Sequence, residues 1–144
     1  MIEQNFKNHR KFVTGYHFVS YFLMFVLLIL SLIKLVNSIK NQTELLTGIS
    51  LVIVSILLIL AFYYLRAFAL KAQDRTIVLE ENIRNYMKKG KFLDKRLSIS
   101  QIIALRFASD EEYDELSQKA IDKKLSGNEI KSEIMHWKPD HYRL

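Results

Sequence analysis

Residues 45–65 read LLTGISLVIVSILLILAFYYL, and residues 66–90 continue as RAFALKAQDRTIVLEENIRNYMKKG. The first stretch holds 21 residues without a charge. An α-helix of that length, rising about 1.5 Å per residue, covers the roughly 30 Å hydrocarbon core of a bilayer. The second stretch is rich in good helix formers, and its first stop signal is Lys88-Lys89-Gly90. We therefore predict a transmembrane helix over residues 45–65 that continues without a break as a cytoplasmic extension over residues 66–90.

A second apolar block precedes this stretch, over residues 12–36. It holds 25 residues, and its only full charge, Lys34, lies near the far end, where the side chain can reach the interface. The block is longer than the roughly 7 to 15 apolar residues of a signal peptide and is not followed by a small-residue cleavage site. We predict a retained transmembrane helix over residues 12–36 and a short external loop over residues 37–44. Together the two spans form a helical hairpin.

The charges and tyrosines around the spans predict its orientation. Basic residues lie before the first span and after the second, whereas the connecting loop carries only one. In order, they are Lys7, Arg10 and Lys11, then Lys40 in the loop, then Lys71, Arg75 and Arg84. Tyrosines near the same interface form an aromatic belt, and these are Tyr16, Tyr21, Tyr63 and Tyr64. Both termini, including the segment 1–11, are therefore expected on the cytoplasmic side of the membrane.

Residues 91–144 are polar and show three short helical patterns. Each opens with a Ser-x-x-Gln/Glu capping box: Ser98 with Gln101, Ser109 with Glu112, and Ser126 with Glu129. Apolar residues follow at helical spacing: Ile99, Ile102 and Ile103, then Tyr113, Leu116 and Ala120, then Ile130, Ile134 and Trp137. Pro139 is expected to end the last helix. The predicted fold is all-α, with a small tail bundle that leans on the long helix, the membrane surface or a partner because its core is thin.

Composition and motifs argue against several classes of function. The formal charge is +6, but residues 71–144 carry 15 basic and 13 acidic residues, so nucleic acid is not an expected partner. The chain has no cysteine and none of the motifs of nucleotide-binding or hydrolytic enzymes. The pairs His9 with His17 and His136 with His141 lack metal-site spacing. We expect no enzyme activity, no cofactor and no metal.

The charged residues of the extension allow two interpretations. One is a solvated helix face supported by an i,i+4 pair between Glu80 and Arg84. The other is a short coiled coil in which Ile77, Leu79 or Ile83 faces another chain. A basic group farther along could also attract anionic lipids, but Arg84 lies about 27 Å beyond Arg66 on a straight helix, so the tail would have to fold back. That basic group is Arg84, Lys88, Lys89, Lys91, Lys95 and Arg96.

Several phrases spread over nearly the whole chain carry a family resemblance. They are Asn8-His9-Arg10, Tyr16-His17, residues 66–70, Gln73-Asp74-Arg75, Leu79-Glu80-Glu81, residues 101–110, Ile130-Lys131, Trp137 and Asp140-His141-Tyr142-Arg143. As a set they resemble an uncharacterised bacterial membrane family, domain of unknown function 6526. The resemblance implies a two-span membrane protein with a cytoplasmic helical tail, and it implies no established reaction, cofactor or partner.

We predict a polar cluster at the cytoplasmic interface, formed from residues on either side of the hairpin. Its members are His9, Arg10, His17, Arg66, Gln73, Asp74 and Arg75. Residues 105–110 and 137–143, which include Trp137, are expected to dock against the cluster as a structural brace. Charges that are costly to bury alone would be paired there, and these are Arg106, Asp110, Asp140 and Arg143.

The expected function is a structural or interaction module of the bacterial inner membrane, or an accessory subunit of a larger membrane assembly. Its expected partners are the lipid bilayer and either another membrane protein or a second copy of the chain. An alternative is a membrane-tethered sensor or regulator whose helical tail responds to lipid or to a soluble ligand. A third reading is an enzyme acting on lipid headgroups through the interfacial histidine, arginine and aspartate residues, whose turnover would be lost in His17→Ala.

Overall fold

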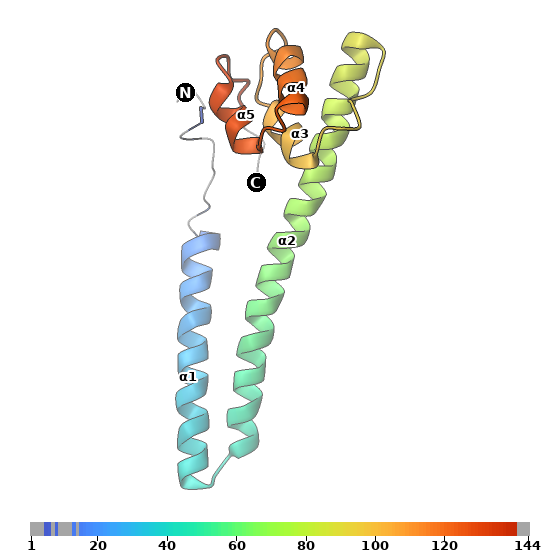
Figure 1. Cartoon of the computed structure of the whole chain (residues 1–144). Coiled ribbons are helices and arrows are strands. Elements are labelled where there is room, and N and C mark those ends of the chain that lie inside the picture. The colour runs from blue at the N-terminus through green and yellow to red at the C-terminus, as the bar shows by residue number, and fades with distance from the viewer. Residues whose placement is uncertain (1–4, 7, 9–12, 14, 141–144) are drawn as a thin grey trace. The chain divides into compact units, whose positions relative to one another are not determined.

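The computed structural model describes residues 5, 6, 8, 13 and 15–140. Its elements are a π-helical turn η1 (Gly15–Val19) and the helices α1 (Ser20–Asn41), α2 (Leu45–Lys89), α3 (Ile99–Leu105), α4 (Tyr113–Asp122) and α5 (Gly127–Glu133). Two long apolar helices pack as a hairpin, and three short helices form a small bundle (Figure 1). The predicted all-α fold is confirmed. The chain divides into a hairpin unit within residues 12–69 and a tail unit that includes residues 70–140.

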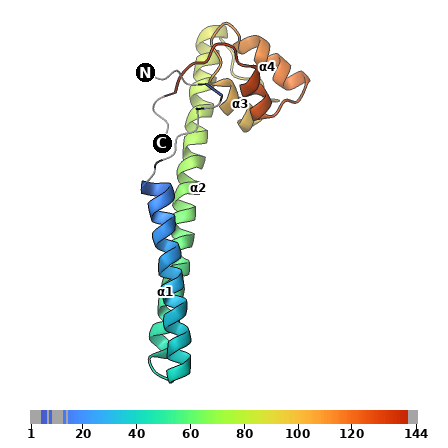
Figure 2. The same ribbon diagram turned by 90° about the vertical axis from the view of Figure 1, so that its left-hand side faces the viewer.

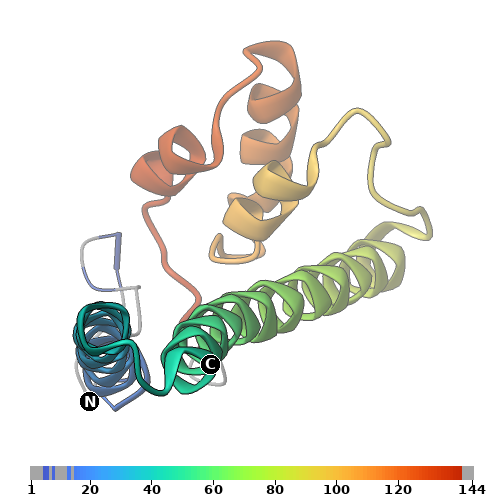
Figure 3. The same ribbon diagram turned by 90° about the horizontal axis from the view of Figure 1, so that it is seen from below.

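The link between the hairpin helices is shorter than the loop predicted over residues 37–44. Helix α1 continues to Asn41, and α2 begins at Leu45. Figure 3 shows the short link between the two helices from below. Gln42, at φ 52°, ends α1 in the left-handed conformation, and the Thr43 N–H donates to the Ser38 carbonyl at 3.2 Å. Lys34 pairs with Glu44 across this link. Carbonyls at the end of α1 are thus satisfied locally, so three residues suffice for the reversal.

Small residues line the contact between α1 and the first half of α2. Ser31 and Ser38 on α1, and Gly48 and Ser55 on α2, are buried, and the members of each pair are seven residues apart. A Cβ at Gly48 would lie 3.0 Å from the Leu35 Cα. Small residues allow backbones to approach closely, as in helix pairs inside membranes, and the seven-residue spacing keeps them on one side of each helix.

Large apolar side chains of the hairpin point outward instead. Phe22, Leu46 and Leu57 are 65%, 81% and 58% exposed. In the most apolar 18-residue stretch of each helix, only 6% of the first helix and 11% of the second are buried within the protein. A core helix of a soluble protein would be covered on such positions. Both helices are long and apolar enough to cross a membrane.

Helix α2 is one unbroken helix of 45 residues (Figures 1 and 2). It ends at Lys89, and Gly90 follows with a φ of +66°, a left-handed conformation that glycine adopts without steric cost. The Gly90 N–H donates to the Tyr86 carbonyl at 2.7 Å. The continuous helix and its predicted stop signal are confirmed.

The tail bundle is built around fully buried Leu105, Phe107 and Ile130. The predicted apolar positions of α4 are all buried, and Val78 of α2 packs against the same core. The buried amide of Gln101 donates from Nε2 to the carbonyls of Ala120 and Leu125, both at 2.9 Å, and so ties α3 to the end of α4. The bundle therefore leans on the long helix. Ile99, predicted to face the core, is instead 60% exposed.

Two of the three predicted capping boxes form completely, those at Ser98 and Ser126. The third forms only in half. The Ser109 N–H donates to Glu112 Oε1 at 3.3 Å, but α4 begins at Tyr113 with no side-chain cap. The Glu112 carboxylate also accepts the N–H groups of Met135 and His136, at 3.0 and 3.1 Å. This contact with a distant segment sets the position of Glu112, which a local pattern cannot reveal.

The third helical pattern was predicted to run to Pro139, and that prediction is wrong. Helix α5 ends at Glu133, and Ile134 is extended. The chain then pairs with the segment after α3, because the Ser109 N–H donates to the His136 carbonyl at 3.1 Å and the Lys138 N–H to the Phe107 carbonyl at 2.8 Å. Trp137 therefore lies opposite Ala108 in an antiparallel bridge rather than on a helix.

Candidate functional site

The face of α2 that meets the tail bundle carries polar residues inside an apolar stripe. Ile77, Glu81 and Asn85 recur every four residues and are 4%, 6% and 8% exposed. Residues at this spacing share one side of a helix. The Asn85 amide donates from Nδ2 to the Lys91 carbonyl at 2.7 Å, which holds the segment that leaves α2. Glu81 is left as a buried carboxylate that needs a partner.

Arg84 is that partner, and it joins α2 to the bundle. Its Nη1 donates to Glu81 Oε2 at 3.2 Å, its Nη2 to the Ala108 carbonyl at 2.8 Å, and its Nε to Asp110 Oδ1 at 2.7 Å. The guanidinium carbon lies 4.5 Å from the centre of the Tyr113 ring. The planar fork of arginine suits this set of acceptors, which a lysine could not serve together.

The electrostatics of this group follow from burial and pairing. Burial opposes the charge of Arg84, but its hydrogen bond to Asp110 and the nearby charges of Glu81 and Asp110 outweigh that effect and raise the pKa of Arg84. The hydrogen bond from Arg84 lowers the pKa of Asp110. Burial, followed by the nearby Glu81 charge, raises the pKa of Tyr113. Arg84 and Asp110 therefore remain an ion pair across the neutral range, with Tyr113 as a neutral phenol beside it.

A second ion pair in the tail bundle joins Arg106 and Asp140. Arg106 Nη1 lies 3.1 Å from Asp140 Oδ2, and the Arg106 side chain is only 8% exposed. Next to it, the Trp137 and Phe107 rings lie 4.9 Å apart, and the Lys131 ammonium lies 5.6 Å from the Phe107 ring centre. Arg106, Trp137 and Asp140, three of the residues predicted from the sequence, thus come together.

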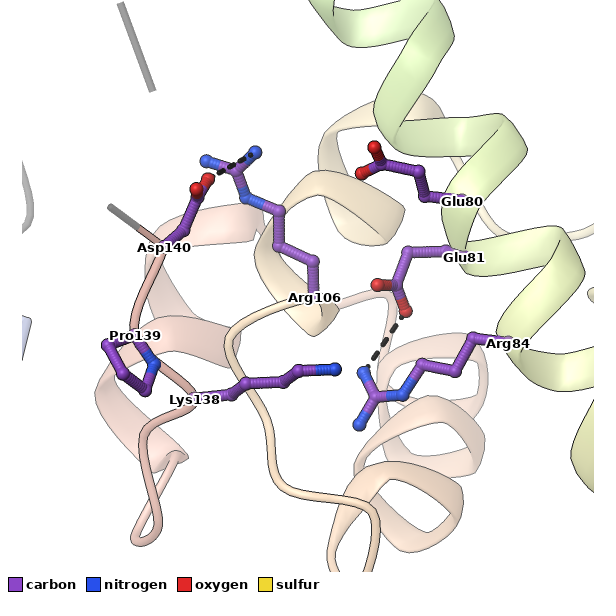
Figure 4. A pocket seen from close by; sticks show the side chains of 7 residues that line it. All are labelled: Glu80, Glu81, Arg84, Arg106, Lys138, Pro139 and Asp140. Atoms are coloured by element: carbon purple, nitrogen blue, oxygen red, sulfur yellow. Dashed lines mark hydrogen bonds and ion pairs between the residues drawn. The ribbon is translucent and has the colours of Figure 1, made fainter. Parts of the chain in front are cut away.

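A cavity of about 380 Å³ separates the two ion pairs (Figure 4). Its lining consists of Glu80, Glu81, Arg84, Arg106, Lys138, Pro139 and Asp140. Three cations therefore face three carboxylates. Figure 4 shows Glu81 with Arg84 and Arg106 with Asp140 already joined. Such a balanced site fixes the position of the segments that supply it. Among the residues that the structure describes, no group of three or more His, Cys, Asp or Glu could hold a metal ion.

The other predicted site residues belong to both units of the chain. Asp110 pairs with Arg84, whereas Asp74 lines a separate cavity of about 450 Å³ with Ile103 and Gly127. Gln73 is half-buried and Arg75 is exposed on α2. In the hairpin unit, the Tyr16 ring lies 5.2 Å from the His17 ring and 6.0 Å from the Arg66 guanidinium carbon. His9, Arg10 and Arg143 lie outside the described residues.

Sequence reasoning missed the central role of Glu81 and the long reach of Glu112. The ion pair that forms on α2 is Glu81 with Arg84, in place of the predicted Glu80–Arg84 pair. The available signal was the position of Glu81, four residues after the apolar Ile77, which assigns it to the buried face. No comparable signal in the sequence predicts that Glu112, expected only in a capping box with Ser109, also binds the backbone of Met135 and His136.

Most of the basic group considered for lipid binding is engaged within the chain. Arg84 and Lys89 pair with Asp110 and Asp114, and Lys88 donates to the Asp110 carbonyl. Arg96 pairs with Asp94 at 2.7 Å. All members of the group except Arg84 are exposed, but these contacts engage four of the six basic residues, which weakens the case for lipid attraction at this place.

A family model described as a family of unknown function, DUF6526, matches residues 1–144. The chain belongs to DUF6526. The resemblance drawn from the sequence phrases is therefore confirmed over the full length. No curated protein and no solved structure matches the chain. DUF6526 brings no reaction with it, so the role of the cluster around Arg84 has to be argued from its geometry.

Proposed function

We propose that the chain is an integral protein of a bacterial inner membrane that acts as a structural or interaction module. The observation that carries the proposal is the outward exposure of large apolar side chains along both hairpin helices, with small residues between them. Water would penalise that surface heavily, whereas lipid tails would solvate it. In this proposal, both termini and the tail unit lie in the cytoplasm, as the basic residues flanking the spans favour.

The role proposed for the tail unit is to hold the second half of α2 in a fixed frame. Its charges support this role because Arg84 and Arg106 are each paired inside the protein. Glu112 and Gln101 bind backbone groups rather than facing an open site. A rigid frame on a membrane stalk suits an accessory subunit of a larger assembly. The proposal involves no chemistry and no cofactor.

Orientation can be tested by cysteine labelling, because the natural chain has no cysteine. Thr43→Cys lies in the exposed link of the hairpin, and Lys123→Cys lies on an exposed position of the tail. A membrane-impermeant maleimide added to intact cells is expected to label Thr43→Cys and to reach Lys123→Cys only after permeabilisation. The reverse pattern would overturn the orientation. Release of the chain from membranes by alkaline carbonate would overturn membrane insertion itself.

The accessory role is tested by copurification from native membranes in a mild detergent. We expect a membrane protein to copurify in fixed stoichiometry and to be lost in Arg84→Ala, in which the tail frame is broken. Recovery of the chain without any copurifying protein would contradict an accessory role. If the protease protection of the tail then varied with lipid headgroup, the membrane-tethered sensor would be the better description.

A further inference from the structure

A second apolar stripe runs along the tail-unit part of α2, on the side roughly opposite Glu81. Its large members are Leu79, Ile83 and Tyr86, which are 61%, 49% and 52% exposed. On a helix with 100° between successive residues these three positions share one face, and the buried positions face the other way. The tail bundle therefore covers one apolar face of α2 and leaves a second one open.

The spacing of this stripe is that of a coiled-coil seam. Ala72, Thr76, Leu79, Ile83 and Tyr86 are all exposed and alternate by four and three residues, so they occupy successive d and a positions of a heptad. The Phe92 ring stacks on the Tyr86 ring with their centres 5.2 Å apart. Phe92 is itself 70% exposed, so it extends the apolar surface at the end of the seam.

The charges beside the seam indicate which partner fits it. In this register Arg75 is a g position and Glu80 is an e position, and both are exposed. In a parallel pair of identical helices, each g residue faces the e residue five positions later on the other helix. Arg75 of one copy would thus face Glu80 of the other, twice by symmetry. An antiparallel pair would set arginine against arginine and glutamate against glutamate.

We propose that two copies of the chain associate in parallel through this seam of α2. The inference deepens the proposed function and partly rests on it, because two copies inserted with one topology present their α2 helices parallel. The seam from Ala72 to Tyr86 is about 22 Å long. So short a coiled coil is weak between free chains in water, but confinement in one membrane raises the effective concentration of each copy for the other.

Other occupants fit the stripe less well. An anionic lipid surface favours basic residues on both flanks, whereas Glu80 places a carboxylate on one of them. Glu80 also borders the cavity of about 380 Å³, where Figure 4 shows it beside Glu81 on α2. Glu80 is an exposed residue and therefore lies at the edge shared by the cavity and the seam.

Single cysteines in the cysteine-free chain test the seam directly. Leu79→Cys and Ile83→Cys are expected to give disulfide-linked dimers under mild oxidation in native membranes. The matched control, Lys71→Cys, lies exposed on the same helix but off the seam, and we expect at least a fivefold lower yield of dimer there. Equal yields at all three positions, no dimer at Leu79→Cys and Ile83→Cys, or cross-links only to a different protein would overturn the proposal.

The flanking charges provide a second, independent readout. Arg75→Glu and Glu80→Arg are each expected to reduce cross-linking through Ile83→Cys several-fold, because each sets like charges together. The double exchange should restore it. If the double variant cross-linked no better than the single ones while its tail kept its wild-type melting temperature, the parallel arrangement would be wrong.

Carbonate extraction of the same membranes separates this inference from the proposed function. A chain that remains in the membrane but gives no seam cross-link contradicts only the dimer. A chain that is released contradicts the membrane proposal, and its cross-linking pattern still decides whether two copies meet through Leu79 and Ile83.

Discussion

The Arg84 guanidinium donates from Nε to Oδ1 of Asp110 at 2.7 Å, which links α2 to the turn before α4, 26 residues away in the chain. The two side chains are unequal partners. Arg84 is 14% exposed, whereas Asp110 is 66% exposed. Arg84 also serves the buried Glu81 and the Ala108 carbonyl. Most of the free energy of this contact should therefore depend on the arginine.

Arg84→Ala should destabilise the tail unit by about 2–4 kcal/mol, because it leaves the Glu81 carboxylate buried without a partner. Asp110→Ala is the matched control and should cost less than about 1 kcal/mol, since an exposed partner contributes little. The only tryptophan, Trp137, lies in the tail unit, so its fluorescence during urea unfolding reports on this region. An equal loss of stability in the two variants would refute the asymmetry.

The tail unit should lose stability in acid because the pKa values of two of its carboxylates are lowered in the folded state. Hydrogen bonds from the Arg96 side chain and backbone lower the pKa of Asp94 to about 2, and the bond from Arg84 lowers the pKa of Asp110. A carboxylate with a lowered folded-state pKa contributes stability above its unfolded pKa, about 3.9, and loses it as the pH falls through the folded value. We expect the melting temperature to fall between about pH 4 and pH 2.

The fall in melting temperature in acid should be smaller in the two variants that remove these carboxylates, Asp94→Asn and Asp110→Asn. Their melting temperatures at pH 7 are expected to lie below that of the natural chain and to approach it near pH 2. The measurement is a series of thermal melts followed by Trp137 fluorescence. A pH profile that remained parallel to that of the natural chain would show that other groups cause the acid sensitivity.

Glu112 should contribute more to the stability of the tail unit than its neighbour Glu111. The Glu112 carboxylate accepts the N–H groups of Met135 and His136 and so fixes the segment after α5, whereas Glu111 is exposed. Glu112→Ala is expected to cost about 1–2 kcal/mol of tail stability, as hydrogen bonds to a charged group are stronger than average. Glu111→Ala should be nearly neutral. Limited proteolysis should also cut near Met135 faster in Glu112→Ala, and unchanged cleavage there would argue against the contact.

Helix α5 approaches α3 too closely for a side chain at Gly127. A Cβ at this position would lie 2.8 Å from Ser100 Oγ and 3.0 Å from the Ser100 carbonyl oxygen, and the backbone atom cannot rotate away. Gly127→Ala should therefore destabilise the tail by about 1–3 kcal/mol, although alanine is otherwise the better helix former. Asn128→Ala, at the next and exposed position, serves as the control. A stabilised Gly127→Ala would mean that the two helices can separate at little cost.

Local chemistry explains which parts of the fold could be predicted from the sequence. The end of α2 depends on Gly90, and the starts of α3 and α5 depend on Ser98 and Ser126, each acting within a few residues. The end of α5 depends instead on backbone pairing between residues 107–109 and 136–138. A helical period in Ile134 and Trp137 could not reveal this pairing, because it competes with the helix only once the bundle has formed.

The residues of the candidate site could likewise be predicted only in part from the sequence. The sequence singled out Arg106 and Asp140 as charges needing partners, and the structure joins them at 3.1 Å. From the sequence, Arg84 was expected to pair with Glu80, although Glu81 is the residue that faces the bundle. One step along a helix rotates a side chain by about 100°, so the choice between neighbouring glutamates depends on which face is covered. The covered face of α2 is identified by Val78, which packs against the bundle core.

The hairpin offers the last prediction, at Gly48. A Cβ there would lie 3.0 Å from the Leu35 Cα and 3.4 Å from Ser38 Oγ, so a larger residue must push α1 and α2 apart. Gly48→Leu is expected to lower the melting temperature of the detergent-solubilised hairpin by several degrees, because close backbone approach contributes much of the packing between helices inside a membrane. Ser50→Leu adds a similar apolar side chain at an exposed position two residues on and should have little effect. Equal melting temperatures for the two variants would mean that the small residues do not set the distance between the helices.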